Sequence, residues 1–269
     1  MSDQAHSLYG GRVLIEFKEK GHRYTVHVDG KKIKPPSVTQ VTGIVDKSGP
    51  IQWWAINNTL RVCRDLIKPG EYYSVDELSH IFEKARRESA FRKQEAADIG
   101  TAVHKWIELY FHNLEPEMPP EDPYLSCVNA ALAWIKQHNV KILHNERPVY
   151  SLNLNVSGRL DGIAIVDDKK SVIDFKTGNG IYPEAWLQTA AYQSFYEQET
   201  GDKIEQRVII RLGKEDGKFY ALILPEETFM EDLLGFNGAV CLYRRIEEIR
   251  KTDTKHSTNR DWLDELVEK

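Results

Sequence analysis

The stretch SGRLDGIAIVDDKKSVIDFKTG, residues 157–178, decides how we interpret the rest of the chain. Two β-branched, apolar runs flank an Asp-Asp-Lys-Lys turn, which is typical of a β-hairpin. Three of its strand positions, Asp161, Asp174 and Lys176, hold charges where core residues are expected. Because burial of charge is unfavourable, two carboxylates and an ammonium on a partly buried hairpin indicate either a functional site or an exposed edge.

The pairing of the hairpin strands determines whether these charges meet. With residues 168–169 as the two-residue loop, Asp161 lies opposite Lys176. Ile163 then lies opposite Asp174, and all four share one face because side chains alternate with a period of two. Diagonal neighbours have backbones ~7–8 Å apart, so both carboxylates can reach one ion between them. A register shifted by two residues would keep this shared face, and a shift by one would destroy it.

A divalent cation would explain the charges. Two carboxylates on one partly buried face repel each other, and burial penalises each charge. Mg²⁺ characteristically binds one or two carboxylates and keeps several waters. Lys176 would then point at an anion held by the metal, which suits phosphodiester hydrolysis, where negative charge grows during the reaction. The alternative is a diagonal of surface charges on an edge hairpin, and the hairpin alone does not decide between the two.

The bulk composition sets limits on the class of protein. The chain has 269 residues, 41% hydrophobic and 29% charged, which is ordinary for a globular α/β protein. No apolar run approaches the roughly 18 residues of a membrane helix, so we expect no membrane partner. Three separated cysteines without a CxxC pair argue against an iron–sulphur cluster and suit a reducing cytoplasm. A net charge of −5 means that any nucleic-acid binding must come from local basic patches.

Periodicity and turn residues predict the elements around the hairpin. We expect an N-terminal hairpin with strands at 13–17, 22–28 and 31–33, a strand-rich block from residue 141, a second hairpin at 206–224, and helices at 51–64, 75–112 with a break at Gly100-Thr101, 124–137, 183–199, 226–250 and 260–268.

Two helical segments carry further candidate residues. GTAVHKWIELY, residues 100–110, places His104 and Glu108 at i and i+4 on one helix face. AWLQTAAYQSFYE, residues 185–197, places Gln188 and Tyr192 one turn apart. Taken alone, each segment is better explained as an ordinary amphipathic helix. The HExxH pattern of zinc proteases is absent.

Taken in order, these motifs resemble a known family. GTAVHKWIE, Glu146 in NERPVY, SGRLDGIAIV, VIDFKTG and LQTAAY are similar to the RecB-like branch of the PD-(D/E)xK nuclease superfamily over about residues 98–212. The segment HRYTVHVDGKKIKPPSVTQ, followed by IQWWA, resembles the leading part of phage-type exonucleases in that superfamily. The resemblance implies an α/β fold with a central mixed β-sheet flanked by helices, a restriction-endonuclease-like core, and Mg²⁺- or Mn²⁺-dependent cleavage of DNA.

The resemblance also implies a metal shell. Asp161 and Asp174 match its carboxylate ligands, with the carbonyl of Phe175 beside them. His104 matches a histidine that joins the metal in this branch. Glu146 matches an acidic residue on the preceding strand, which supports the ligands, binds a second metal or is merely structural.

Other matched positions are expected to act on the substrate. Lys176 would orient or activate the attacking water and stabilise the developing charge, and Glu108 would be an additional acid near a second ion. Gln188 and Tyr192 match a helix motif that positions the substrate and the catalytic strand. The chain lacks the cysteines of the iron–sulphur members and any GxxxxGK[ST] motor motif, so we expect neither a cluster nor DNA unwinding.

Candidate DNA contacts lie outside these motifs. They are Arg86, Arg87, Arg92 and Lys93 before the His104 segment, Lys31, Lys32 and Lys34 after the first hairpin, and Trp53 and Trp54 as stacking residues, of which we expect at least one in the core. The alternative for the arginines is a solvated helix face balanced by Glu83, Glu88 and Glu95.

The hypothesis is a metal-dependent DNA exonuclease of phage-type recombination or DNA processing. The alternatives are a structure-selective endonuclease and a non-catalytic DNA-binding module on a nuclease fold. Expected partners are DNA and a single-strand-annealing recombination protein, in the cytoplasm of a bacterial or phage-infected cell. We expect one domain, residues 1–269, with an N-terminal elaboration (1–97), a catalytic core (98–225) and C-terminal helices (226–269).

Overall fold

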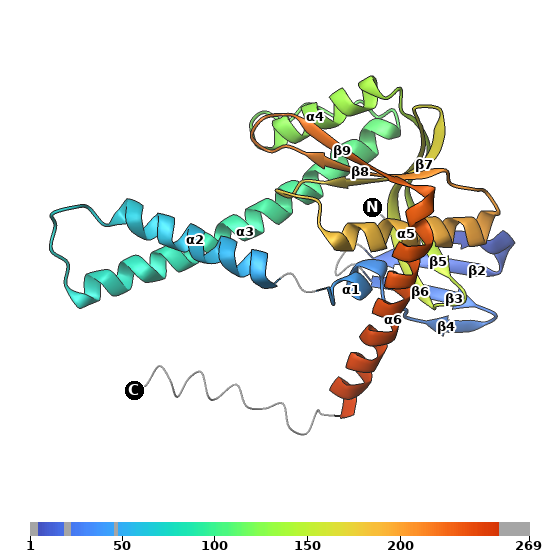
Figure 1. The fold of residues 1–269 in the computed structure, drawn as a ribbon, viewed down its shortest axis with the longest axis horizontal. Helices are drawn as coiled ribbons and strands as arrows, with labels where there is room; N and C mark the ends of the chain where they lie inside the picture. The colour runs from blue at the N-terminus through green and yellow to red at the C-terminus, as the bar shows by residue number, and fades with distance from the viewer. Residues whose placement is uncertain (1–4, 19–22, 46–47, 253–269) are drawn as a thin grey trace.

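The computed structural model describes residues 5–18, 23–45 and 48–252. The helix expected at 260–268 lies outside the described residues. The fold is mixed α/β, with a four-stranded antiparallel sheet in the order β1-β2-β3-β4 and a five-stranded mixed sheet in the order β5-β6-β7-β8-β9, both flanked by helices (Figure 1). The expected fold class is therefore confirmed.

The elements follow the chain in a simple order. The strands are β1 (Ala5–Leu8), β2 (Val13–Lys18), β3 (Arg23–Val28), β4 (Lys31–Ile33), β5 (Lys141–Ser151), β6 (Val156–Val166), β7 (Lys169–Lys176), β8 (Gln206–Leu212) and β9 (Phe219–Pro225). The α-helices are α1 (Val38–Thr42), α2 (Ser48–Leu66), α3 (Val75–Phe111), α4 (Tyr124–Gln137), α5 (Pro183–Thr200) and α6 (Phe229–Thr252), and two 3₁₀ turns are η1 (Tyr9–Gly11) and η2 (Glu226–Thr228).

The N-terminal region is a complete four-stranded sheet and not only a hairpin. Tyr9, Gly10 and Gly11 all have positive φ, and this turn returns β1 antiparallel onto β2. The apolar face of the sheet packs against Tyr150 of β5, and the Tyr9 hydroxyl donates to the Tyr150 carbonyl at 2.7 Å. The N-terminal sheet is thereby attached beside the larger sheet.

Helix α3 is continuous, so the expected break at Gly100-Thr101 is wrong. The Thr101 hydroxyl donates to the Ala97 carbonyl at 3.2 Å within the helix. A Cβ at Gly100 would lie 3.0 Å from Thr177 Oγ1, so the glycine serves a close approach between α3 and the segment after β7. Figure 1 shows α2 and the N-terminal half of α3 projecting side by side from the body.

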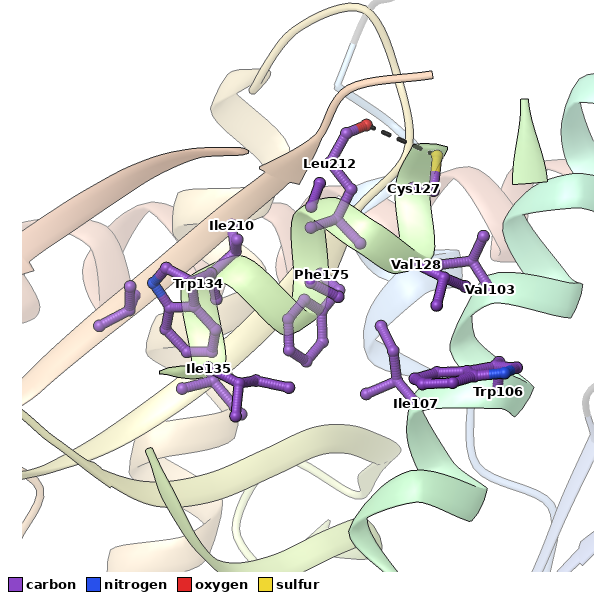
Figure 2. Packing of buried hydrophobic residues seen from close by; sticks show 14 of the residues in the cluster. Val103, Trp106, Ile107, Cys127, Val128, Trp134, Ile135, Phe175, Ile210 and Leu212 are labelled. Atoms are coloured by element: carbon purple, nitrogen blue, oxygen red, sulfur yellow. Dashed lines mark hydrogen bonds between the residues drawn. The ribbon is translucent and has the colours of Figure 1, made fainter. Parts of the chain in front are cut away.

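Helices cover both faces of the larger sheet. On one face, Trp106 of α3 and Trp134 of α4 belong to a core cluster with residues of β6, β7 and β8 (Figure 2). Trp134 meets Phe175 of β7 edge to face, with ring centroids 5.6 Å apart. On the other face, α1, α5 and α6 pack around Phe195 and Phe236. This packing places α3 and α5 on opposite sides of β6 and β7.

The register of the β6–β7 hairpin differs from the one expected. The two-residue loop is Asp167-Asp168, with φ of +48° and +64°, so Val166 pairs with Lys169 and Ile163 with Val172. Aspartate tolerates this left-handed region better than most residues, which explains the choice of turn. Pairing ends at Gly162↔Ile173, so the next residues on each strand, Asp161 and Asp174, lie where the strands separate.

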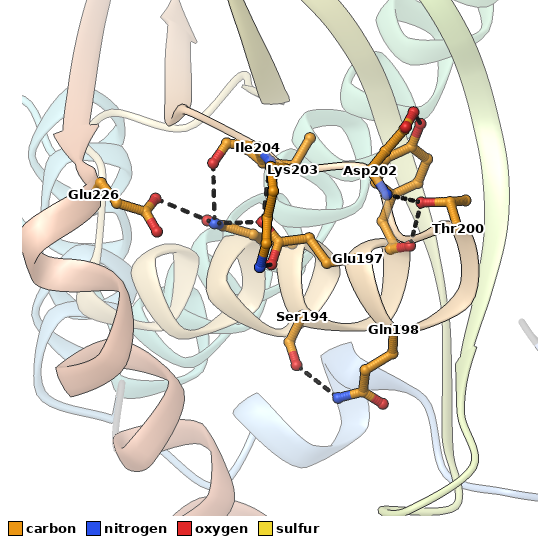
Figure 3. A network of polar contacts seen from close by, with 10 residues as sticks. Ser194, Glu197, Gln198, Thr200, Asp202, Lys203, Ile204 and Glu226 are labelled. Carbon is orange, nitrogen blue, oxygen red and sulfur yellow. Dashed lines mark hydrogen bonds and ion pairs between the residues drawn. The ribbon is translucent and has the colours of Figure 1, made fainter.

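The β7–α5–β8 connection is held by a polar network at the end of α5 (Figure 3). Gly201 ends the helix in the left-handed region, with φ of +76°. Glu197 accepts the Ile204 backbone N–H at 2.9 Å and pairs with Lys203 at 3.1 Å. These contacts fix α5 against the parallel β7–β8 pair, and so determine where the other half of α5 lies.

Candidate active site

A pocket of about 770 Å³ gathers most of the predicted site residues where β6 and β7 separate. Its walls come from α3, α5, β5, β6, the segment after β7 and the N-terminal sheet. The predicted residues that line it are His104, Glu108, Glu146, Asp161, Phe175, Lys176, Gln188 and Tyr192. Asp174 lies fully buried beneath Lys176.

Three of these residues could hold a metal ion. One ligand atom each of His104, Glu146 and Asp161 lies within 4.8 Å of the others, although the three come from α3, β5 and β6. His104 Nδ1 is 3.4 Å from Asp161 Oδ2, which also accepts the Phe175 backbone N–H at 2.7 Å. Glu146 has φ of +48°, an uncommon conformation for a residue other than glycine. An imidazole nitrogen with two carboxylates suits a divalent cation such as Mn²⁺ or Mg²⁺.

The charges of the three groups depend on one another. Burial, followed by the neighbouring Asp161 carboxylate, raises the pKa of Glu146 to about 8. Burial lowers the pKa of His104, but the charge and hydrogen bond of Asp161 outweigh it and raise this pKa to about 9. Burial raises the pKa of Asp161, but His104 overcomes this effect and the pKa is lowered. Without a metal, His104 and Glu146 therefore hold protons at neutral pH, and these protons reduce the negative charge that a bound cation would otherwise neutralise.

A second set of contacts runs from β7 to α5. Lys176 Nζ lies 2.7 Å from Asp174 Oδ2 and donates to Gln188 Oε1 at 3.2 Å. Gln188 Nε2 in turn donates to the Tyr192 hydroxyl at 3.1 Å. A Cβ at Gly158 would lie 2.6 Å from Tyr192 Cε1, so the glycine of the SGRLD motif makes room for this ring. The chain of contacts orients the Lys176 ammonium from two sides.

The protonation of this pair follows from burial and charge. Burial raises the pKa of Asp174 by more than Lys176 lowers it, and the net result is a pKa of about 6. Burial lowers the pKa of Lys176, but Asp174 and Asp161 outweigh it and the net shift is upward. At neutral pH the lysine is therefore an ammonium, suited to stabilising negative charge and unsuited to accepting a proton.

The two aspartates make different closest contacts. Asp161 contacts His104 on α3, whereas Asp174 contacts Lys176, which reaches toward Gln188 on α5. The three-residue group contains Glu146 and does not contain Asp174. The assignment of Asp174 and of the Phe175 carbonyl as ligands stays a prediction.

Other predicted residues take more ordinary positions. Glu108 is bound by Lys105 at 2.6 Å, at the pocket wall and outside the three-residue group. Arg86 and Arg92 pair with Glu83 and Glu88 on the exposed face of α3, as the alternative interpretation proposed. These pairs do not test DNA binding.

Of the remaining basic and aromatic candidates, Lys31 and Lys32 lie on β4 and Lys34 directly after it, whereas the others lie on the projecting helices. Arg87 is 3.9 Å from Glu83, and Lys93 follows on the same helix. Trp53 is 70% exposed and Trp54 is only partly buried, so the expectation that one of them is in the core is wrong. Helices α2 and α3 pair here away from the sheets, and no other helix or strand of the described residues covers their outer faces (Figure 1).

Two site features escaped the sequence analysis. Arg159 pairs with Glu146 at 2.7 Å and lies over the Phe17 ring, 4.6 Å from its centroid. Phe17 and Tyr24 bring the N-terminal sheet into the pocket wall, with ring centroids 4.9 Å apart. Arg159 stands inside the quoted SGRLD motif, which was a usable signal, whereas the approach of the N-terminal sheet had none.

Comparisons with known proteins add little. No family model and no curated protein matches the chain. Among solved structures, 21 chains match, and the one described as the crystal structure of SSO0001 is 12% identical with a TM-score of 0.29, covering 70% of this chain and 86% of that chain. So low a score supports no conclusion about function. Within the described residues, no helix has the length and apolar character needed to cross a membrane.

Proposed function

We propose that this protein is a metal-dependent deoxyribonuclease that hydrolyses phosphodiester bonds as an exonuclease. The observation that carries the proposal is that His104, Glu146 and Asp161 meet at ligand distance in the same pocket as the Lys176 ammonium. From the sequence resemblance we extend the proposal to membership of the RecB-like nucleases, to cytoplasmic DNA processing in phage-type recombination, and to a single-strand-annealing protein as partner.

The pocket residues divide into two groups with different tasks. His104, Glu146 and Asp161 would hold Mg²⁺ or Mn²⁺, with Asp174 as a further predicted ligand. A bound divalent cation stabilises charge on phosphate oxygens and lowers the pKa of water. Lys176 is held by Asp174 and Gln188 and would stabilise the charge that develops on the phosphate. Metal and ammonium together suit a reaction whose transition state is more anionic than its substrate.

The walls of the pocket favour action at a strand end. Phe17 and Tyr24 of the N-terminal sheet border one side of the pocket, and residues 37–39 continue this wall. A continuous duplex needs free space on every side of the cleaved bond, whereas a strand that ends in the pocket has only one direction in which to leave it. This wall is the feature that supports an exonuclease over an endonuclease.

The test is digestion of linear and covalently closed circular DNA with Mg²⁺ or Mn²⁺. An exonuclease degrades only the linear form, and an excess of chelator abolishes the reaction. Degradation of both forms would show an endonuclease, and degradation of neither would leave only the DNA-binding module. Vigorous cleavage in excess chelator would overturn the metal assignment.

A matched pair of variants separates the site from the fold. Asp161→Asn removes a predicted ligand and should abolish cleavage. Asp167→Asn makes the same chemical change in the exposed turn of the same hairpin, where asparagine tolerates positive φ, and should leave cleavage unchanged. Equal activity of the two variants would remove Asp161 from the site.

A further inference from the structure

A second cavity, of about 500 Å³, lies beside the candidate active site. It is formed by β3, the connection from β4 to α1, and the C-terminal half of α6. Tyr24 lines this cavity and also the active-site pocket, so the second cavity and the pocket are adjacent at this side chain. The lining residues that matter below are Arg23, Tyr24, Lys34, Gln40 and Arg244.

A well-anchored segment forms the wall between the two hollows. Residues 34–36 line the second cavity, whereas residues 37–39 line the active-site pocket. The Ser157 backbone N–H donates to the Pro36 carbonyl at 3.0 Å, which ties the segment to β6 one residue before the SGRLD glycine. Ser37 and Gln40 form a reciprocal capping box at 3.0 and 2.8 Å. The relative position of the two hollows is thereby fixed.

The second cavity carries cations on a protein whose net charge is −5. Arg23 and Lys34 are exposed, and neither forms a salt bridge with any residue that the structure describes. Arg244 is held at the wall by a hydrogen bond from its Nη2 to the Leu154 carbonyl. These three side chains place positive charge around an open, polar hollow.

The carboxylates of the cavity do not cancel this charge. Glu247 pairs with Arg250 at 2.8 Å, and Glu248 pairs with Arg245 at 3.2 Å. Each carboxylate therefore has its own arginine on α6. The cations on the opposite wall, which come from β3 and the β4–α1 connection, remain in excess.

We infer that this cavity binds the phosphodiester backbone of the strand whose end lies in the active site. The inference rests on the proposed function and adds the path of the substrate to it. A nucleic-acid strand carries regularly spaced anions, so phosphates next to the reacting one must lie close to the active-site pocket. Lysine and arginine contacts to such phosphates position a strand without reading its sequence. The cavity that meets the pocket at Tyr24 is where those contacts are available.

The test compares two variants with the same change of charge. Arg23→Gln/Lys34→Gln removes two cations from the cavity, at exposed positions where substitutions usually leave the fold intact. Lys136→Gln/Lys169→Gln removes two exposed cations near the Asp167 turn, which lies beside the end of α4 and at the opposite end of the hairpin from Asp161. Fluorescence anisotropy of a labelled single strand, in chelator and across a salt series, gives the affinity of each without cleavage.

The expected effect follows from counterion release. Loss of two phosphate contacts to a single strand reduces the slope of log affinity against log salt by about 1.4. When the salt concentration rises fourfold, the affinity of wild type should therefore fall by a factor about seven times larger than the affinity of the cavity variant does. The control variant should keep the wild-type slope. Competition by inorganic phosphate and by a deoxynucleoside monophosphate should be equal for all three proteins, because the inferred contacts belong to a strand.

Each result has a distinct meaning. If wild type cleaves DNA but the cavity variant binds the strand like the control, the inference is overturned and the nuclease proposal stands. If the cavity variant loses competition by the free monophosphate, the cavity is a mononucleotide or phosphate site and the strand path is overturned. If wild type neither binds nor cleaves DNA, both proposals fail together.

Discussion

Lys176→Met separates what this lysine does for the fold from what it does for the reaction. The substitution keeps a long apolar stem but removes an ammonium 2.7 Å from Asp174 Oδ2, whose side chain is only 1% exposed. At that distance and an effective dielectric constant of about 20, the pair interacts by about 6 kcal/mol before desolvation is subtracted. Removal of one partner of a buried pair costs about 3–5 kcal/mol. For a chain of this size that is a fall in Tm of about 6–20 °C.

The loss of stability caused by Lys176→Met should grow as the pH rises. Burial raises the folded-state pKa of Asp174 to about 6, above its ordinary value of 3.8. Between these values the folded protein holds a proton that the unfolded chain has released, so stability falls as pH rises through this window. Without Lys176 the pKa of Asp174 rises further, and the loss continues above pH 6. The difference in Tm between wild type and Lys176→Met should therefore widen above about pH 6 and shrink below it.

Lys176→Met should lower the rate of cleavage without weakening the binding of DNA. Loss of a preorganised charge that meets the transition state lowers turnover by roughly 10²–10³-fold. DNA binding in Ca²⁺ should survive, and metal affinity should hold or rise because a nearby positive charge is gone. The assay is single-turnover cleavage at saturating enzyme beside a binding titration in Ca²⁺. Lys105→Met, which removes another pocket lysine, paired with Glu108 at 2.6 Å, is the control and should retain turnover. Near-normal single-turnover cleavage by Lys176→Met would refute the catalytic role.

Three further substitutions test the site and its support. His104→Ala should weaken metal binding more than it slows saturated turnover, with partial rescue by raised Mn²⁺, and an unchanged metal titration would make the residue structural. Gly158→Ala places a Cβ 2.6 Å from Tyr192 Cε1 and should cost about 1–3 kcal/mol in thermal or denaturant unfolding, and a neutral effect would show that the ring moves freely. Asp232→Ala leaves the buried Arg207, now 2.8 Å from that carboxylate, without its charge partner and should cost about 3–5 kcal/mol, whereas a loss below 1 kcal/mol would show that solvent reaches the arginine.

Local patterns in the sequence predicted much of the fold. The helix expected at 124–137 matches α4 (Tyr124–Gln137), and α5 and β5 begin at the expected residues, Pro183 and Lys141. These elements are determined by apolar spacing and by prolines and glycines near their ends, which act within a few residues. The break expected at Gly100 failed because that glycine serves a contact with Thr177, far along the chain.

The sequence by itself determined that Asp161, Asp174 and Lys176 lie on a hairpin inside an α/β fold, because alternation and turn composition are local properties. The Asp-Asp-Lys-Lys turn allowed more than one two-residue loop, and the structure showed that the loop is Asp167-Asp168, one residue before the expected one. Only the tertiary structure decided which distant groups meet: Glu146 joins His104 and Asp161, and Lys176 reaches Gln188. The physical reason is that these contacts depend on how α3 and α5 pack against opposite faces of one sheet. That packing brings together residues separated by dozens of positions, which no local pattern records.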